Sequence, residues 1–125
     1  MRYLLDCDII IDYLRGYRPT IRKLEMLLKK GDNLFVSVVT NLELHVGESI
    51  TQKKTLEKIN ELFKLLAIVE IDAKIAGLAG DFRRIYHASI PDAIIAACAY
   101  QINATLITRN LKHYRSIREI KIKSL

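Results

Sequence analysis

The sequence has few of the residues that mark secreted, disulfide-rich or membrane proteins. It contains two cysteines, two prolines and no tryptophan in 125 residues. Cys7 and Cys98 show no metal or redox spacing, so we expect both thiols to be reduced. No apolar run approaches the roughly 20 residues of a membrane span, and the start shows no pattern of a signal peptide. We therefore expect a cytoplasmic protein without a membrane partner.

Apolar residues and positive charge are what the sequence has in excess. Half of the residues are hydrophobic, and the formal net charge is +6. This length and apolar content suit one domain, residues 1–125, with a core of its own. The charge favours a polyanionic partner, nucleic acid ahead of a membrane surface. A Lys-rich surface on an ordinary soluble protein is the open alternative.

Short apolar segments alternate with amphipathic segments along the chain. The β-branched and apolar runs predict strands, and the helical spacing of apolar residues between them predicts helices. Strands separated by helices favour a mostly parallel sheet covered on both faces, a three-layer α/β/α sandwich. The predicted strands cover residues 3–5, 34–39, 67–71, 105–107 and an edge strand near 120–125. The helices follow Asp8 and cover residues 21–30, 53–66, 72–86 and 91–102, with one more beginning at Thr40.

Polar residues recur where predicted strands end or helices begin. Asp6, Glu43, Asp92 and Asn110 fall at comparable places, and three of them are acids. The carboxyl ends of parallel strands form the edge of an α/β sheet where ligands bind. Carboxylate oxygens are preferred by Mg²⁺ and Mn²⁺, which can activate water against a phosphodiester. The spacing indicates a divalent-metal site, unless these acids are paired structurally.

Structural alternatives stay open for several of these residues. Thr40 and Glu43 fit a capping box, in which Glu43 would serve the helix and not a metal. Asp92 opens a helix behind Pro91, where an acid suits the helix dipole. Asp8 is favoured as the N-cap of the first helix rather than as a first ligand.

Other reactive side chains show no arrangement of their own. The histidines His45, His87 and His113 share no ligand spacing and are interpreted as surface or packing residues. A buried Cys7 thiol beside carboxylates should have a raised pKa and be a poor nucleophile. Asp12 lies on the first helix and should be exposed or paired.

Four motifs in order, LLDCDIIIDYL, VVTNLEL, IPDAIIAACA and TLITRN, resemble those of the PIN-domain family. The resemblance covers nearly the whole chain and is closest to VapC-type toxins of toxin–antitoxin pairs. It implies a parallel α/β/α sandwich and endonucleolytic cleavage of RNA with Mg²⁺ or Mn²⁺, blocked by a cognate antitoxin. Asp6, Glu43 and Asp92 match the family's catalytic, metal-binding acids, and Asn110 falls where many relatives carry a fourth acid.

Asn110 and the first motif depart from the family pattern. An amide accepts hydrogen bonds but adds no negative charge, so a second metal should bind more weakly. Cys7-Asp8 replaces the commoner Thr-Asn or Thr-Ser after the first Asp. Thr108, at the end of its strand, could hydrogen-bond a metal-binding carboxylate, and Asp8 is expected to support the site.

Basic residues near the acidic motifs predict where RNA would bind. A positive groove would hold the strand while the acids hold the ion. Tyr114 is a possible stacking surface for a base. For Lys121 and Lys123, protection of a sheet edge is an equally good explanation. The candidate RNA-binding residues are Arg15, Arg109, Lys112 and Arg115.

The leading hypothesis is a metal-dependent endoribonuclease, the toxin of a VapBC-type pair. A catalytically impaired PIN-like module that binds RNA or a partner is the first alternative. An aspartyl phosphotransferase or phosphatase, suggested by Asp6-Cys7-Asp8 after a strand, is the second. The amphipathic helices between about Thr40 and Leu66 are candidates for antitoxin contact and for homodimerisation, or simply pack on the sheet.

Overall fold

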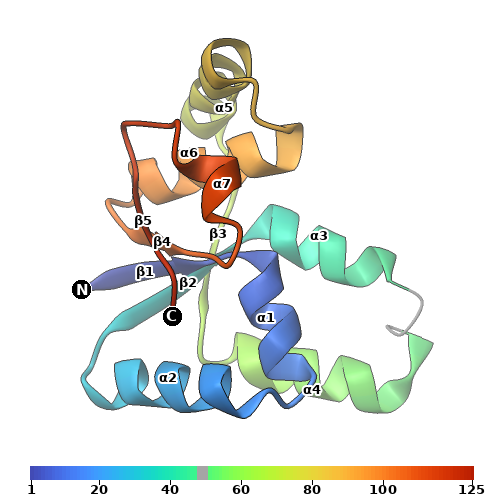
Figure 1. The fold of residues 1–125 in the computed structure, drawn as a ribbon. Helices are drawn as coiled ribbons and strands as arrows, with labels where there is room; N and C mark the ends of the chain where they lie inside the picture. The colour runs from blue at the N-terminus through green and yellow to red at the C-terminus, as the bar shows by residue number, and fades with distance from the viewer. Residues whose placement is uncertain (48–50) are drawn as a thin grey trace.

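A five-stranded parallel sheet runs through the computed structural model, which describes residues 1–47 and 51–125 (Figure 1). The strand order is β3-β2-β1-β4-β5, so the first strand of the chain lies at the centre. Each neighbouring pair is parallel. The strands are β1 (Arg2–Leu5), β2 (Asn33–Ser37), β3 (Ala67–Val69), β4 (Thr105–Ile107) and β5 (Lys121–Lys123).

Side chains of β1 alternate between the two faces of the sheet, and each face has its own core. Tyr3 and Leu5 belong to one apolar cluster, and Leu4 belongs to the other. This alternation follows from the pleat of a strand, whose successive side chains point to opposite faces. One face packs on α1 (Cys7–Leu14), α2 (Arg18–Lys29) and α4 (Lys53–Phe63); the other packs on α5 (Ala73–Tyr86), α6 (Ile90–Gln101) and α7 (Leu111–Tyr114).

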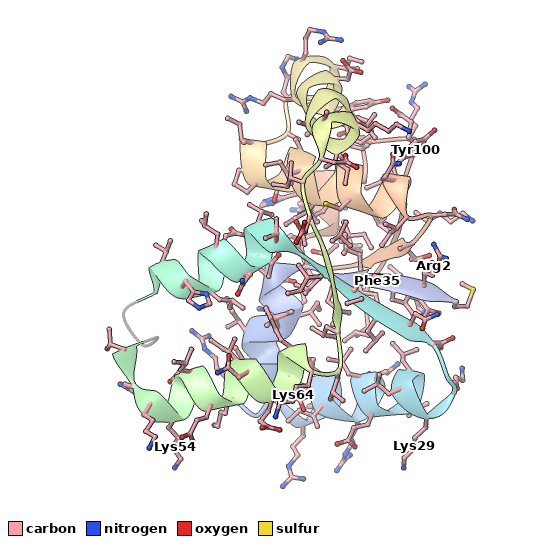
Figure 2. The ribbon with its side chains drawn as sticks, turned by 180° about the vertical axis from the view of Figure 1, so that it is seen from behind. Arg2, Lys29, Phe35, Lys54, Lys64 and Tyr100 are labelled. Atoms are coloured by element: carbon pink, nitrogen blue, oxygen red, sulfur yellow. The ribbon has the colours of Figure 1, made fainter. Side chains whose placement is uncertain are left out.

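These layers confirm the predicted α/β/α sandwich. From behind, the strands lie between the two groups of helices, with Phe35 of β2 near the middle (Figure 2). Helix α3 (Val38–Val46) continues from the carboxyl end of β2. Among the helices of the described residues, none combines the length and the apolar content needed to cross a bilayer.

Helix α6 is the most deeply buried helix, as its apolar sequence indicates. Its small residues Ala93, Ala96, Ala97 and Ala99 are at most 1% exposed. Short side chains allow α5 to pack closely on α6, with Phe82 of α5 fully buried against it. Burial of a phenylalanine side chain stabilises a fold by roughly 1.5–3 kcal/mol, so this face contributes strongly to the free energy of folding.

The boundary between β2 and α3 differs from the prediction. The strand ends at Ser37, whose hydroxyl caps α3 by accepting from the Val39 amide at 3.2 Å. Val38 and Val39 are β-branched and favour a strand, but the serine cap turns the backbone into a helix before them. Thr40 therefore lies inside the helix, and its predicted role as N-cap is wrong.

Other boundaries agree more closely. Asp72 caps α5 as predicted, accepting from the Ile75 amide at 2.8 Å. Helix α6 begins at Ile90, capped by Ser89, so Pro91 occupies its second position and not the first. The short helix α7 had no sequence signal strong enough to predict it. The predicted helical region between about Thr40 and Leu66 includes residues 48–50, which lie outside the described residues.

Candidate active site

The carboxyl ends of β1 and β4 lie side by side, because Leu5 pairs with Ile107. The residues that follow, Asp6 and Thr108, are therefore neighbours although 102 positions separate them. The chain continues from β1 to β2, which pairs with one side of β1, and β4 later pairs with the other side. In open α/β sheets such a reversal of strand order is where ligands bind.

Asp6 is buried at this edge and hydrogen-bonded through both oxygens. Its side chain is the N-cap of α1, and Oδ1 accepts from the Cys7 amide at 2.8 Å. Oδ2 accepts from the Thr108 hydroxyl at 2.8 Å. The Thr108 oxygen accepts in turn from the Asn110 amide at 3.0 Å, which orients its proton towards Asp6. The hydrogen bond expected from Thr108 to a carboxylate of the site is thus present.

Asp8 does not cap the first helix, contrary to the prediction. It lies in the first turn of α1 because the helix begins one position before it, with Asp6 as cap. Its Oδ2 accepts from the Arg109 amide at 2.9 Å, and Oδ1 is buried without a partner. Asp8 therefore ties α1 to the loop after β4 and presents one unpaired oxygen.

Asp92 lies in the first turn of α6 and is held by two side chains of α7. Tyr114 donates its hydroxyl proton to Oδ1 at 3.0 Å, and His113 Nδ1 lies 3.1 Å from Oδ2. His113, interpreted from the sequence as a surface or packing residue, lies at the surface and in addition contacts this acid. Tyr114 is fully buried, which also overturns its proposed role as a stacking surface for RNA bases.

Glu43 lies on α3, and the capping box that would explain it without a metal does not form. The capping box needs Thr40 as N-cap, but Ser37 has that position. The Oε1 atom of Glu43 is buried without a hydrogen-bond partner. The side-chain oxygens of Thr40 and Asn41, on the same helix, are buried and unpaired as well. A buried acceptor without a donor costs free energy, so α3 presents oxygen atoms that a bound cation or water would satisfy.

Burial and neighbouring charges raise the pKa values of Asp6 and Glu43. Burial raises the pKa of Asp6, with the charge of Asp92 adding to it and hydrogen bonds from Thr108 and Cys7 opposing it. Burial, followed by the charges of Asp6 and Asp92, raises the pKa of Glu43. The three acids therefore share one electrostatic environment, although Asp6 follows β1 and the other two lie on α3 and α6.

Cys7 confirms the expectation for a thiol in this environment. Burial is the main cause that raises its pKa, to about 12, and the charges of Glu43, Asp6 and Asp8 add to the effect. A thiol with this pKa stays protonated at neutral pH, so Cys7 is a poor nucleophile.

The donor chemistry fits a hard divalent cation. The unpaired oxygens of Asp8 and Glu43 and the charge of Asp6 and Asp92 are what Mg²⁺ and Mn²⁺ prefer. Within residues 1–47 and 51–125, however, no three acidic, histidine or cysteine side chains are already close enough to hold one ion. Hydrogen bonds from Thr108 to Asp6 and from Tyr114 to Asp92 offset part of the repulsion between these carboxylates.

Asn110 reaches the cluster only through its backbone. Its amide hydrogen-bonds Thr108, while its side chain is exposed and, among the described residues, makes no hydrogen bond. Asn110 was expected as a fourth site residue, but the structure brings its backbone N–H, and not its side-chain amide, towards the acids.

The four candidate RNA-binding residues surround the cluster in different ways. Arg109 is paired with Asp12, at 3.1 Å between Nε and Oδ2, and so supports the loop after β4. This pair also accounts for Asp12, which was expected to be exposed or paired. Lys112 and Arg115 are exposed on and just after α7, beside the residues that hold Asp92. Arg15 is exposed at the end of α1 and, with Glu43, lines a hollow of about 420 Å³.

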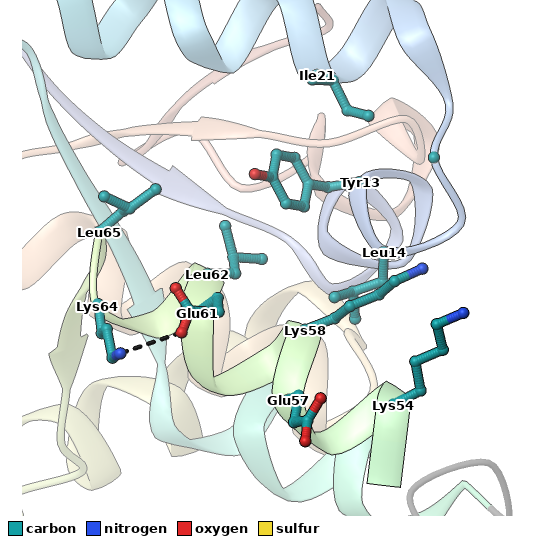
Figure 3. A pocket seen from close by; sticks show the side chains of 11 residues that line it. Tyr13, Leu14, Ile21, Lys54, Glu57, Lys58, Glu61, Leu62, Lys64 and Leu65 are labelled. Atoms are coloured by element: carbon teal, nitrogen blue, oxygen red, sulfur yellow. Dashed lines mark hydrogen bonds and ion pairs between the residues drawn. The ribbon is translucent and has the colours of Figure 1, made fainter. Parts of the chain in front are cut away.

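A larger hollow of about 720 Å³ lies away from the acids, between α1, α2 and α4 (Figure 3). Tyr13, Leu14 and Leu62 form apolar parts of its wall, and charged residues of α4 stand along its side. Its size does not make it the active site, because none of the acids described above lines it.

A parallel α/β sandwich with acids from three elements at the carboxyl edge defines the class of protein. The family model of the PIN domain matches residues 3–118. The chain therefore belongs to the PIN-domain family, as its motifs indicated.

Known proteins resemble the chain over almost its full length. It is 29% identical over 113 residues to ribonuclease VapC19 of Mycobacterium tuberculosis, covering 89% of this chain and 90% of that protein. It is 26% identical to ribonuclease VapC2 of Rickettsia felis, covering 99% and 98%. A solved structure of VapBC2 from Rickettsia felis, bound to a DNA fragment from the promoter, matches with a TM-score of 0.88, 26% identity and coverage of 100% and 99%. VapBC-1 from nontypeable Haemophilus influenzae matches with a TM-score of 0.82, 28% identity and coverage of 99% and 98%.

Proposed function

We propose that this protein is a divalent-metal-dependent endoribonuclease and the toxin of a VapBC-type toxin–antitoxin pair. The observation that carries the proposal is the electrostatic coupling of Glu43 to Asp6 and Asp92 at one sheet edge, with a buried oxygen of Glu43 left unpaired. Relatives named VapC ribonucleases, similar over nearly the whole chain, support the activity. RNA would be the substrate and the cytoplasm the location.

Asp6 and Asp92 would hold Mg²⁺ or Mn²⁺, which supplies a positive charge against the phosphate and lowers the pKa of water. Thr108 and the Cys7 amide keep the Asp6 carboxylate fixed. Glu43 orients the attacking water and accepts its proton through the unpaired oxygen. The water oxygen adds to phosphorus as the bond from phosphorus to the ribose oxygen breaks, and the departing ribose oxygen takes a proton from solvent.

Basic residues beside the acids would bind the RNA backbone. Lys112 and Arg115 lie next to the α7 residues that contact Asp92, and Arg15 lines the same hollow as Glu43. Phosphate contacts of this kind give affinity rather than sequence choice. Arg109, already paired with Asp12, contributes less than the other three.

An antitoxin segment would bind the hollow between α1, α2 and α4. Its wall combines apolar side chains such as Leu14 and Leu62 with charged residues of both signs, Lys54, Glu57, Lys58, Glu61 and Lys64. This chemistry suits an amphipathic segment with an apolar face and a polar face. Solved VapBC complexes are among the structures that match this chain, which supports a partner of this class. A homodimeric toxin is part of the same proposal.

The decisive experiment is cleavage of a pool of cellular RNAs by the purified protein in Mg²⁺, in Mn²⁺ and in EDTA. Asp6→Asn and Asp92→Asn should each reduce cleavage more than about 100-fold, beyond the 10–100-fold typical of residues that only support a metal ligand. Asp81→Asn is the matched control, because Asp81 is an exposed aspartate paired with Arg84 on α5.

Three outcomes separate the alternatives. Cleavage that persists in EDTA, or is unchanged in both variants, rejects the proposal. RNA binding without metal-dependent cleavage points to an impaired binding module. The phosphotransferase alternative needs an accessible Asp6 oxygen, but Asp6 is 6% exposed and both its oxygens are hydrogen-bonded. Trapping of Asp6 by beryllofluoride, or a positive aspartyl-phosphate assay, would nevertheless favour that alternative.

A further inference from the structure

Two consecutive side chains of α7 each contact one oxygen of Asp92. The Tyr114 hydroxyl donates to Oδ1 at 3.0 Å, and His113 Nδ1 lies 3.1 Å from Oδ2. Tyr114 approaches from the core, and His113, whose side chain is 55% exposed, approaches from the solvent side. A carboxylate held at both oxygens has little freedom to rotate about its side-chain bonds.

The position of the Tyr114 hydroxyl is not explained by packing. Among the described residues, Tyr114 is the fully buried residue of largest volume. A phenylalanine would fill nearly the same space without a polar atom. A buried hydroxyl needs a partner, and here the partner is an acid of the candidate active site. A phenol keeps its proton at neutral pH, so Tyr114 is the donor in its hydrogen bond to Asp92.

We propose that Tyr114 is a positioning residue, which holds the Asp92 carboxylate towards Asp6 so that both can bind the metal, with His113 as a weaker second support. The inference rests on the proposed metal-dependent function. Each carboxylate oxygen has a second lone pair, so a hydrogen bond to Tyr114 leaves Asp92 able to bind a cation. The hydroxyl also offsets part of the repulsion between Asp6 and Asp92 before a cation arrives.

Residues of this kind act on metal affinity as well as on turnover. Loss of a partner that orients a metal ligand typically costs about 10–100-fold in metal affinity or activity. Tyr86 offers a matched control, because it is a second tyrosine whose hydroxyl hydrogen-bonds a carboxylate, that of Glu119 at the surface. Tyr86→Phe and Tyr114→Phe remove the same atom and the same type of hydrogen bond.

The test is titration of the metal-free full-length protein with Mn²⁺, following the free ion by its electron paramagnetic resonance signal. Tyr114→Phe should raise the Mn²⁺ concentration at half-saturation about tenfold or more. Tyr86→Phe should bind as the wild type does. His113→Asn should give a smaller shift than Tyr114→Phe, with His87→Asn as its control, because His87 is exposed and asparagine tolerates its left-handed backbone.

RNA cleavage at increasing Mn²⁺ gives the second readout. For a positioning role, the midpoint moves in Tyr114→Phe and much of the wild-type rate returns at high Mn²⁺. A purely structural role would lower the thermal midpoint in EDTA and leave the Mn²⁺ midpoint unchanged, which would overturn the inference.

The outcomes distinguish the inference from the proposed function. If the wild type binds no Mn²⁺ and Asp92→Asn changes nothing, the proposed function itself fails. If the wild type binds Mn²⁺, Asp92→Asn abolishes binding and Tyr114→Phe does not shift it, only the inference fails. If Tyr114→Phe does not fold, His113→Asn provides the test. A Mn²⁺ concentration at half-saturation equal to that of His87→Asn would then overturn the inference that α7 positions Asp92.

Discussion

The α5–α6 face and the carboxyl edge of the sheet differ in the kind of side chain that they bury. The face buries apolar side chains such as Phe82 and Ile95, which need no partners. The edge contains acids. Among the described residues, the buried side-chain oxygen atoms that lack a hydrogen bond also lie there, on α1 and α3. They belong to Asp8, Thr40, Asn41 and Glu43. The face therefore supplies stability, while the edge keeps unsatisfied groups that a ligand would satisfy.

The largest expected effect comes from opening the stable face. Phe82→Ala should lower the free energy of unfolding by about 3–5 kcal/mol, because it removes a fully buried ring and leaves a cavity. Ile85→Ala, on the same helix but 55% exposed, should cost less than about 1 kcal/mol. Urea unfolding followed by circular dichroism measures both. Equal losses would mean that burial on this face does not account for its stability.

A smaller loss is expected where the two regions meet at the end of β4. Thr108→Val removes the donor to Asp6 and the acceptor of the Asn110 amide, and should lower the free energy of unfolding by about 2 kcal/mol. Thr105→Val makes the same change on the same strand, away from the acids, and should be nearly neutral. Both variants are compared in urea without metal. An effect of Thr108→Val no larger than that of Thr105→Val would show that the hydrogen bond to Asp6 contributes no stability.

At the carboxyl edge, removal of a charge should stabilise the metal-free protein. Burial and the neighbouring charges of Asp6 and Asp92 disfavour ionised Glu43. Glu43→Gln should therefore raise the free energy of unfolding, by less than about 1 kcal/mol because the side chain is partly exposed to screening solvent. Glu25→Gln, on the exposed side of α2, is the control and should change little. A free energy of unfolding lower than that of the wild type for Glu43→Gln in EDTA would contradict this expectation.

The smallest effect concerns pH. Asp6, Asp8 and Glu43 have raised pKa values, so the folded protein binds more protons than the unfolded chain. Their stabilising contribution is full below the ordinary carboxyl pKa of about 4 and is lost as pH rises through the raised values. Stability of the metal-free wild type should thus increase relative to Glu43→Gln as pH falls from 7. The difference in slope should be a fraction of the roughly 1.4 kcal/mol per pH unit that a full proton gives. Denaturation at a series of pH values measures it, and a slope of opposite sign would contradict the raised pKa of Glu43.

Sequence patterns were sufficient for the layers and for most element positions. The continuous apolar run of β1 and the almost wholly apolar α6 left few other ways to bury those surfaces. The motifs also predicted that Asp6 and Asp92 belong to one site, and the electrostatic contact between them agrees with this. Their role in binding a metal stays a prediction.

The errors occurred where a local preference competed with tertiary context. Thr40-x-x-Glu43 has the pattern of a capping box, but Ser37 ends β2 three residues earlier and caps the helix itself. Asp8 looked like a cap for the same reason, although Asp6 holds that place. A cap depends on where the strand before it ends, and pairing with neighbouring strands decides that point.

Spacing and residue type alone determined that this chain forms a parallel α/β sandwich with acids after its strands, because apolar periodicity restricts which surfaces can be buried. Only the tertiary structure decided which donors the acids meet. Thr108 reaches Asp6 across 102 positions and Tyr114 reaches Asp92 across 22, through pairing of β1 with β4 and docking of α7 on α6. Such contacts depend on strand register and side-chain direction, which local sequence does not encode.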